Sequence, residues 1–332
     1  MTEHILGMDI GGANLKYVCG DGTTLDRAFP LWKRHNELGE QLQRDLARFS
    51  GVHCWAVTMT GELADCYADR AEGVAHIVDC VSQLASRLGV RQVLFYAVGG
   101  DFRTAEQAKE DVDAIAASNW HAFASAIAQE IAGDGLLIDV GSTTTDIIPL
   151  RGGRVATDAR SDFERLREGS LVYVGCRRTP ICSLVETLTC NGHSVPVMNE
   201  LFGTIDDAML LLGHLAGQSE CLDTADGRPR TAEHAVGRIA RMLGLDRREI
   251  SRSVADSLAE QVLVAAKKRI QAPIANLAAM TSGPWILGGH GQALVQVPEE
   301  HTTIDLRRTL GSDLSRCGPA WAVMRLARQE AL

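Results

Sequence analysis

The hydrophobic pattern of the chain contains the same three-part unit twice. Residues 7–18, GMDIGGANLKYV, and residues 136–150, LLIDVGSTTTDIIPL, each run from an apolar segment through a glycine-containing polar turn into a second apolar segment. This pattern is typical of a buried strand that enters a tight turn and returns as a second strand. We therefore expect one β-hairpin near the N-terminus and a related one near the middle of the chain.

The two units align without a gap. The alignment pairs three positions of the first unit with three of the second: Asp9 with Asp139, Gly11 with Gly141, and Lys16 with Asp146. A repeated unit indicates an internally duplicated architecture. Two such hairpins facing one another could hold a diphosphate or triphosphate between two halves of the molecule.

Apolar periodicity predicts the elements between and after the hairpins. It predicts strands at residues 25–31, 52–60 and 91–98, a short strand followed by glycines within 285–294, and helices at 36–49, 73–88, 105–128, 201–215, 231–243 and 251–271. Pro273 should close the last of these helices. Residues 151–184 read as a strand region rich in Gly and Arg, and the tail 315–332 should form a helix that packs back on the first half.

Composition excludes some classes of function. The 332 residues suffice for two domains with separate cores. A net charge of −9 without a basic block argues against binding to nucleic acid or to an anionic membrane surface. No apolar run reaches membrane-spanning length, and residues 1–12 already read as strand and loop, so we expect no secretory signal and a cytoplasmic location.

The nine cysteines include no CxxC pair, which favours reduced thiols. Cys176, Cys182, Cys190 and His193 could be grouped as a metal cluster, but their spacing matches no zinc pattern. We interpret them as packing or surface thiols.

The turn of the second hairpin has the chemistry of a phosphate cradle. Gly141 lets the backbone approach an anion, successive N–H groups form an anion-binding concavity, and nearby hydroxyls add donors. Carboxylates beside such a cradle repel a bare phosphate, which indicates Mg²⁺ between them, held through its waters. An ordinary polar hairpin in a core sheet is the alternative.

A polar patch follows the predicted strand 52–60. Glu62, Asp65 and Arg70 lie beyond its carboxyl end, where ligands gather in open α/β sheets. A charged loop leading into a helix explains them equally well. We interpret His121, inside a predicted helix, as a packing residue rather than a catalyst.

Two further segments suit a phosphorylated ligand. Arg177 and Arg178 form a basic pair beside Pro180, and arginine makes bidentate phosphate contacts, although a solvated turn explains the pair nearly as well. Gly288 and Gly289 follow a short strand and would let the backbone pass close to a ligand.

These motifs, in this order, resemble the actin-like ATPase superfold, which includes sugar kinases, heat-shock chaperones and actin. Within it, DIGGANLK and IDVGSTTTDIIPL look most like the hydantoinase/oxoprolinase branch. More narrowly, TMTGELADCYADR, SNWHA, LVYVGCRRTP, ELFGT, DTADGRPR and GGHG together resemble a family linked to the tetrahydromethanopterin and methanofuran C1 pathway. This resemblance covers nearly the whole chain.

The resemblance implies an α/β fold of the actin-like ATPase (ribonuclease H-like) class, with two related domains facing a cleft. We expect a first domain at 1–130, a second at 131–314 with a helical insert, and a C-terminal helix at 315–332. It also implies a transferase of methanofuran biosynthesis. The enzyme would condense an (aminomethyl)furanyl-methyl diphosphate with the phenol oxygen of tyramine or γ-glutamyltyramine and release diphosphate. The partners would be these small molecules, and a homodimer is left open.

Site roles follow from this reaction as hypotheses. Asp9 with Asp139 or Asp146 would hold Mg²⁺, or another divalent cation, and the diphosphate. Lys16 would neutralise the diphosphate, although a structural bond between Asn14 and Lys16 is an alternative. Glu62, which we expect to be exposed, would accept the phenol proton. The ligand-binding backbone and hydroxyl groups would come from Gly11, Gly12, Asn14, Gly141, Ser142, Thr143, Thr144, Gly288 and Gly289.

Two other classes of function remain open. An ATP-dependent small-molecule kinase or amide-ring hydrolase would use the same hairpins for ATP, with the turn at 288–291 touching adenosine. A non-catalytic sensor or scaffold would have lost the key acids, whereas Asp9, Asp139 and Asp146 are all present. The fold by itself does not decide between them.

Overall fold

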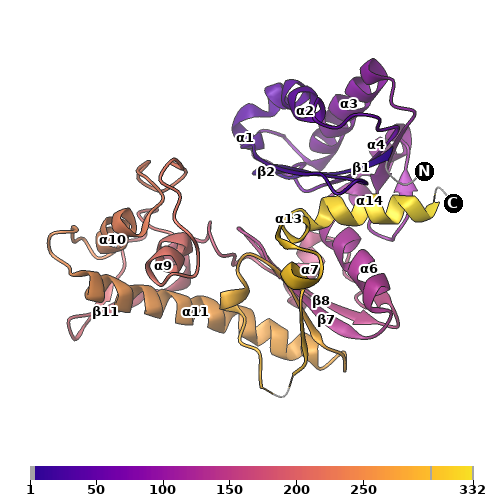
Figure 1. Ribbon diagram of the computed structural model, residues 1–332. Coiled ribbons are helices and arrows are strands. Elements are labelled where there is room, and N and C mark those ends of the chain that lie inside the picture. The colour runs from indigo at the N-terminus through magenta and orange to yellow at the C-terminus, as the bar shows by residue number, and fades with distance from the viewer. Residues whose placement is uncertain (1–3, 300, 331–332) are drawn as a thin grey trace.

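In the computed structural model, which describes residues 4–299 and 301–330, two β-sheets with their helices form two lobes (Figure 1). The first sheet has the strand order β3-β2-β1-β4-β5-β6. Its strands are β1 (Ile5–Ile10), β2 (Asn14–Cys19), β3 (Thr24–Ala28), β4 (Cys54–Met59), β5 (Gln92–Tyr96) and β6 (Phe102–Arg103). The central strand β1 is antiparallel to β2 and parallel to β4, and it is buried along its whole length.

Helices cover both faces of the first sheet. Leu6, Met8 and Ile10 of β1 share a core with apolar residues of α2 and α3, while the other face of the sheet meets the C-terminal helix α14. The helices of this lobe are α1 (Leu31–Arg34), α2 (Leu38–Leu46), α3 (Arg70–Leu88), α4 (Ala105–Glu110) and α5 (Val112–Ile115), with a 3₁₀ turn at His35–Glu37.

The helix predicted at residues 105–128 is wrong as a single element. The structure divides it into α4, α5 and α6 (Asn119–Ile131). Ala117, between α5 and α6, has φ +48°, a left-handed conformation that a continuing α-helix cannot contain. The break lets α6 leave the first lobe and pack on the second.

The second sheet repeats the topology of the first. Its order is β10-β8-β7-β13-β14, with β9 paired to the outer part of β8. The first hairpin strand again lies between its antiparallel partner and a parallel strand from much later in the chain. The strands are β7 (Gly135–Val140), β8 (Thr145–Arg151), β9 (Arg154–Val155), β10 (Leu171–Val172), β13 (Trp285–Gly289) and β14 (Thr303–Asp305).

Helices and one extra hairpin complete the second lobe. They are α7 (Asp162–Glu168), α8 (Ile181–Leu184), α9 (Ile205–Leu211), α10 (Ala232–Arg241), α11 (Arg252–Ala278), α12 (Leu306–Thr309), α13 (Ser312–Arg316), a 3₁₀ turn at Gln292–Leu294, and the hairpin of β11 (Thr187–Cys190) with β12 (His193–Pro196). The prediction that residues 151–184 form a strand region is wrong in part, because residues 162–168 form helix α7. Helix α11 continues past Pro273, so the predicted end there is also wrong.

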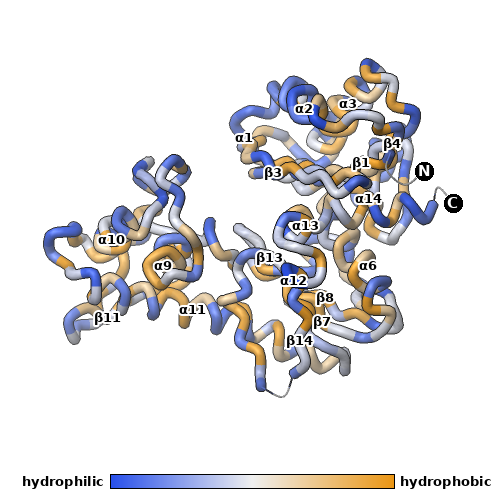
Figure 2. Tube along the Cα trace, viewed as in Figure 1, coloured by the Kyte–Doolittle hydropathy of each residue, from blue (hydrophilic) through white to orange (hydrophobic). Residues whose placement is uncertain are grey.

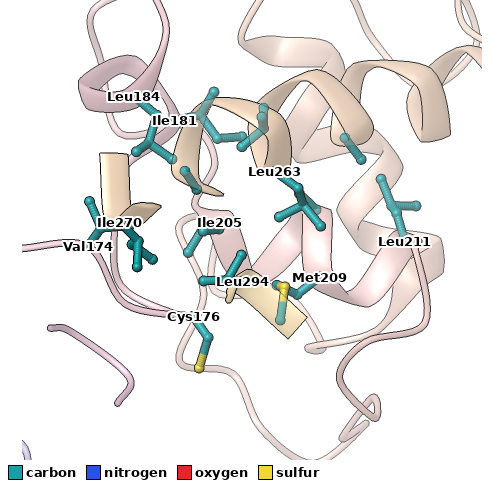
Figure 3. Packing of buried hydrophobic residues seen from close by; sticks show 14 of the residues in the cluster. Val174, Cys176, Ile181, Leu184, Ile205, Met209, Leu211, Leu263, Ile270 and Leu294 are labelled. Atoms are coloured by element: carbon teal, nitrogen blue, oxygen red, sulfur yellow. The ribbon is translucent and has the colours of Figure 1, made fainter. Parts of the chain in front are cut away.

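The helical insert extends from the second sheet and has its own packing. Figure 3 shows Ile205 and Met209 of α9 beside Leu263 of α11, within a cluster that reaches back to Val174 and Cys176 below the second hairpin. Cys176 and Cys190 are buried members of this cluster. All nine cysteines are free thiols, and in the described ranges no three His, Cys, Asp or Glu side chains come together as a metal site would require.

Helices α6 and α14 (Gly318–Glu330) join the two lobes. They lie against each other, α6 on β8 and β9 and α14 on β1, β2 and β4 (Figure 1). One buried cluster includes residues of both helices and of both sheets. Figure 2 shows apolar residues concentrated in the strands and on the helix faces that meet them. Among the helices within the described residues, none combines the length and apolar content needed to cross a membrane.

Candidate functional site

The two hairpins have matching registers. Across β1 and β2, Asp9 lies opposite Lys16. Across β7 and β8, Asp139 lies opposite Asp146. The turns close with equivalent backbone hydrogen bonds, from the Gly11 N–H to the Asn14 carbonyl (3.0 Å) and from the Gly141 N–H to the Thr144 carbonyl (2.9 Å). The gap-free alignment of the sequence is therefore an alignment in three dimensions.

Each hairpin is also held from outside in the same way. In each hairpin, the carbonyl at the end of the first strand accepts a hydrogen bond from a glycine that follows the parallel neighbouring strand, β4 or β13. The Gly61 N–H donates to Ile10 and the Gly291 N–H donates to Val140, both at 3.0 Å. The carbonyl of the second residue of each turn also accepts backbone hydrogen bonds. In the first turn the Leu31 N–H donates to Gly12, and in the second the Arg177 and Arg178 N–H groups donate to Ser142. These bonds fix the positions of both turns before any ligand arrives.

Close backbone contacts below the second turn require glycine. A Cβ atom at Gly175 would lie 2.5 Å from backbone atoms of Thr143, and one at Gly291 would lie 2.3 Å from the Val140 side chain. Both distances are shorter than any van der Waals contact. The segment after β10 and the segment after β13 therefore support the second turn directly.

The two hairpins are electrostatically linked through Lys16. Burial raises the pKa of Asp9 to about 6, and the Lys16 ammonium offsets part of that rise. Burial raises the pKa of Asp139 to about 7, the charge of Asp146 adds to the rise, and Lys16 again opposes it. One ammonium group thus lies near carboxylates of both lobes. Asp9 Oδ1 is buried and has no hydrogen-bond partner.

Several cationic residues, including Lys16, act electrostatically on His290, which follows the Gly288-Gly289 turn. Burial lowers the pKa of His290 to about 4, and positive charges on Arg316, Lys16 and Arg177 contribute to the decrease. His290 is therefore neutral near pH 7. Cationic residues of both lobes thus influence one neutral imidazole, and the charge of Asp26 opposes them. Arg316 and Arg177 also have carboxylate neighbours, Asp26 at 3.9 Å and Asp206 at 3.6 Å.

A cation–π contact spans the lobes beside this group. The Arg178 guanidinium lies 4.7 Å from the centre of the Trp32 ring. Arg177 contacts the carboxylate of Asp206 at 3.6 Å, while Arg178 is exposed. Both arginines thus follow the second turn, and Arg178 contacts the first lobe, whereas Arg177 contacts Asp206 of the second.

Asp146 has a strong protein partner. Its Oδ1 accepts a hydrogen bond from Arg165 of α7, a residue with only 2% of its surface exposed. The Arg165 guanidinium also stacks on Trp120 of α6, 4.1 Å from the ring centre. The Arg165 Nε and the Trp120 indole N–H, both buried, have no hydrogen-bond partner.

Glu62 is buried, which corrects the expectation of an exposed acid. It is 2% exposed, because the start of α3 packs on its backbone at Gly73 and the segment before α6 covers its side chain. Oε1 accepts a hydrogen bond from the Ala117 N–H at 3.0 Å, and Oε2 has no partner. Burial raises the pKa of Glu62 to about 7, and the nearby charge of Asp162 adds to the rise. A carboxyl with this pKa can exchange a proton near neutral pH.

The carboxylates fit a hydrated divalent cation better than a closed metal cage. Asp9 has a buried oxygen without a partner, and Asp139 lies opposite another carboxylate. In the described part of the chain, however, no three potential ligands converge on one point. The ion pair with Arg165 also makes Asp146 the weakest of the three candidate ligands. Magnesium, which keeps several waters, suits such a donor set.

Other predicted residues have structural roles that the sequence did not reveal. The Asn14 side chain donates to Asp26 of β3 (3.0 Å) rather than bonding to Lys16, so the alternative proposed for that pair is wrong. Gly288 is paired with Asp139, and a Cβ there would lie 2.7 Å from the Asp139 carboxylate. The glycines of this turn are therefore needed for packing, whether or not they also touch a ligand.

Sequence reasoning missed four residues at the site: Trp32, Arg165, His290 and Arg316. They come from four separate segments, and only the tertiary fold brings them to the hairpins. For Arg165 a local signal existed, because Ser161 and Glu164 form a capping box that begins α7. Recognising that helix would have placed Arg165 on a short element close to the second hairpin.

Two curated relatives match the chain. A protein of Methanocaldococcus jannaschii is 32% identical over 335 residues, covering 99% of both chains. A protein of Methanococcus vannielii is 29% identical over 213 residues, covering 61% of this chain and 95% of its own. Both are named (4-{4-[2-(γ-L-glutamylamino)ethyl]phenoxymethyl}furan-2-yl)methanamine synthase.

Solved structures of low sequence identity resemble the whole chain. An archaeal actin homologue is 11% identical, with a TM-score of 0.44 and coverage of 98% of this chain and 99% of its own. A ROK family protein from Streptococcus pneumoniae TIGR4, solved with sucrose, is 12% identical with a TM-score of 0.42, over 98% and 99% of the two chains.

The repeated sheet topology and the paired hairpins confirm the predicted actin-like fold class. The model of the hydantoinase/oxoprolinase family matches residues 53–305, which include the second hairpin, the helical insert and the turn after β13. The chain is a member of the hydantoinase/oxoprolinase family.

Proposed function

We propose that this protein joins an (aminomethyl)furanyl-methyl diphosphate to the phenol oxygen of γ-glutamyltyramine, or of tyramine, in methanofuran assembly. The observation that carries the proposal is the full-length match to a synthase whose named product contains a phenoxymethyl group on a furan. In the reaction, the bond between the methylene carbon and the diphosphate oxygen breaks, and its electron pair leaves with diphosphate. The phenol oxygen then forms the new carbon–oxygen bond and loses its proton.

The hairpins would bind the diphosphate. Turn N–H groups and the hydroxyls of Ser142, Thr143 and Thr144 can donate to phosphate oxygens, and Lys16 and Arg177 can offset the charge that grows on the leaving group. The placement of Lys16 near carboxylates of both lobes supports this role. Fixed donors of this kind accelerate a reaction because they need no rearrangement when charge develops.

A divalent cation would belong between the hairpins. Asp9 and Asp139 are the residues that would hold it, directly or through water. Bound there, Mg²⁺ would neutralise part of the diphosphate charge. Without a cation, Asp9, Asp139 and Asp146 would repel the diphosphate.

Glu62 would accept the phenol proton. Its unpartnered Oε2 and its pKa of about 7 support this role, since roughly half of the carboxyl groups would be ionised at that pH. The buried setting would also keep bulk water away from the methylene carbon, which water would otherwise attack. Trp120 and Arg165 lie along the same junction between the lobes.

Turnover of synthetic substrates tests the proposal. The protein is incubated with Mg²⁺, the furanyl-methyl diphosphate and either phenol, and the ether product and released diphosphate are measured. We expect equal amounts of both, and no reaction in an Asp9→Asn variant that keeps its melting temperature. Ether formation that is unchanged in this variant would remove the assigned role of Asp9, and absence of product with both phenols would contradict the proposed reaction.

A further inference from the structure

A cavity lies between the lobes, along α6 rather than at the hairpin turns. Its volume is about 380 Å³, within the range of small-molecule sites. The first lobe contributes the turn after β5, with Val98 to Gly100. The second lobe contributes β9 and the segment that follows it, and α6 and α14 supply one wall each.

Two arginines of this cavity have no carboxylate partner. Arg154 and Arg160 line it, and neither makes an ion pair within 4 Å of any described acidic side chain. Arg160 instead donates from Nη1 to the Val98 carbonyl (3.0 Å), across the two lobes. Asp158 is the one carboxylate among the lining residues, so the two arginines give the cavity a net positive charge. The protein as a whole has a net charge of −9.

The arginine-rich cavity of the helical insert is different. That space, about 210 Å³, is also lined by several arginines. Its Arg241 is paired with Asp226, and its Arg248 with Asp246. Arginines that are already neutralised have little to gain from an anion, so the insert cavity is the weaker candidate.

Neutral polar groups complete the wall formed by α6. His121 is hydrogen-bonded through Nδ1 to the Tyr96 hydroxyl (2.9 Å), which also lies 3.3 Å from Ser125 Oγ. Burial and the charges of Arg160 and Arg165 lower the pKa of His121 to about 4, so the imidazole is neutral at pH 7. Its Nε2 has no partner among the described residues and is available to a ligand.

This cavity is separate from the hairpin site. His121 packs edge-on against Trp120, with ring centres 5.3 Å apart. The Arg165 guanidinium stacks over the Trp120 ring. The buried Trp120 thus stands between the cavity and Asp146 of the second hairpin. A ligand in the cavity would touch residues of both lobes without touching the diphosphate.

We propose that the cavity lined by Arg154, Arg160 and His121 binds a small organic anion that bears a carboxylate or phosphate group. The two guanidinium groups would bind the anionic end, and the neutral imidazole and hydroxyl groups would bind polar atoms of the remainder. Because Arg160 already connects the lobes, the anion would add a second connection between them. Its binding would therefore stabilise one relative position of the lobes.

Calorimetric titration with three probes tests this site: glutamate and citrate as carboxylates, and inorganic phosphate. We expect at least one probe to bind with a dissociation constant in the range of about 1 mM or below. The Arg154→Ala/Arg160→Ala double variant should weaken that binding at least about tenfold. The difference between the carboxylates and phosphate identifies the anionic group.

Two further variants keep the test decisive. Arg167→Ala removes an exposed arginine outside the cavity and should leave probe binding unchanged. Arg154→Glu reverses one exposed charge without removing the Arg160 contact, so it should lose probe binding and keep its circular dichroism spectrum. Binding of diphosphate at the hairpins should persist in all three variants, which separates this site from the proposed function. No binding of any probe, or equal binding by wild type and Arg154→Glu, would overturn the proposal.

Discussion

At the scale of single residues, the site depends on charges whose ionisation is controlled by burial. Asp9, Glu62 and Asp139 all have raised pKa values because each is removed from water. Lys16 opposes the effect at Asp9 and Asp139 but is not among the charges that act on Glu62. Carboxyl groups with raised pKa values are typical of catalytic centres, which supports the roles proposed for these three residues.

The first prediction concerns the rate of condensation and Glu62. A base must be ionised, so kcat/KM of the wild type should rise with pH through about 7, the pKa of this group. Glu62→Gln should lower the rate about 10²- to 10⁴-fold and remove that limb of the pH profile. Asp65→Asn, an exposed neighbouring acid, is the matched control. A Glu62→Gln rate within a few-fold of wild type would show that another group accepts the proton.

The second prediction concerns stability and the same residue. The pKa of Glu62 is about 7 when folded against 4.5 for a free side chain, so the folded state holds its proton more tightly. This contribution is complete below pH 4.5 and is lost as pH rises through about 7. The Glu62→Gln variant should therefore gain stability over wild type with rising pH, by up to roughly 3 kcal/mol at about 1.4 kcal/mol per pKa unit. Denaturant titrations at pH 5 and 8 measure it, and a constant difference would contradict the raised pKa.

The third prediction concerns Lys16 and diphosphate. Lys16→Met removes the cation shared by the hairpins, so diphosphate affinity should fall about 10- to 100-fold, equivalent to roughly 1.4 to 3 kcal/mol. Lys268→Met, at an exposed position of α11, should bind as wild type does. Equal affinities in the two variants would exclude Lys16 from the binding site.

The equivalent residues of the two hairpins were predictable from sequence, because the repeated unit aligns without a gap. The alignment of Asp9 with Asp139 gave the correct register in both hairpins. The burial of Glu62 was not predictable, because it is produced by Gly73 and Ala117, which are distant in sequence from one another. A polar residue after a strand looks exposed until its tertiary neighbours are known.

At the scale of elements, short-range signals explain which predictions succeeded. Long periodic segments such as α3 and α10 formed as expected. The hairpin of β11 and β12 was missed although Asn191-Gly192, with φ values of +49° and +81°, is a favoured two-residue turn. Helix α11 continues through Pro273 because packing of this element outweighs the loss of one backbone donor.

The fourth prediction concerns the element below the second turn. Gly175→Ala would place a Cβ 2.5 Å from the Thr143 backbone, so the turn must move. We expect diphosphate affinity to fall at least about tenfold. Gly39→Ala, where an added Cβ meets nothing within 4 Å, is the control for the loss of a glycine. Unchanged diphosphate affinity in a folded Gly175→Ala variant would show that this turn does not bind the ligand.

At the scale of the whole molecule, two copies of one sheet topology give each lobe an equivalent hairpin. Helices α6 and α14 hold the lobes together on one side, and the contact between Arg178 and Trp32 connects them near the turns. The sequence predicted this duplication and the packing of the C-terminal helix on the first half of the chain, where the structure places it against β1, β2 and β4. It could not predict that α6, from the first half, packs on the second sheet, because that exchange depends on the break at Ala117.

The most direct test of a diphosphate-releasing synthase is a calorimetric titration of the protein with diphosphate and with ATP, each in the presence of Mg²⁺. We expect micromolar or tighter binding of diphosphate, binding of ATP at least about tenfold weaker, and loss of diphosphate binding in Asp9→Asn. Binding of ATP that is tighter than that of diphosphate would contradict a diphosphate-releasing synthase and would favour an ATP-dependent kinase or amide hydrolase built on the same hairpins.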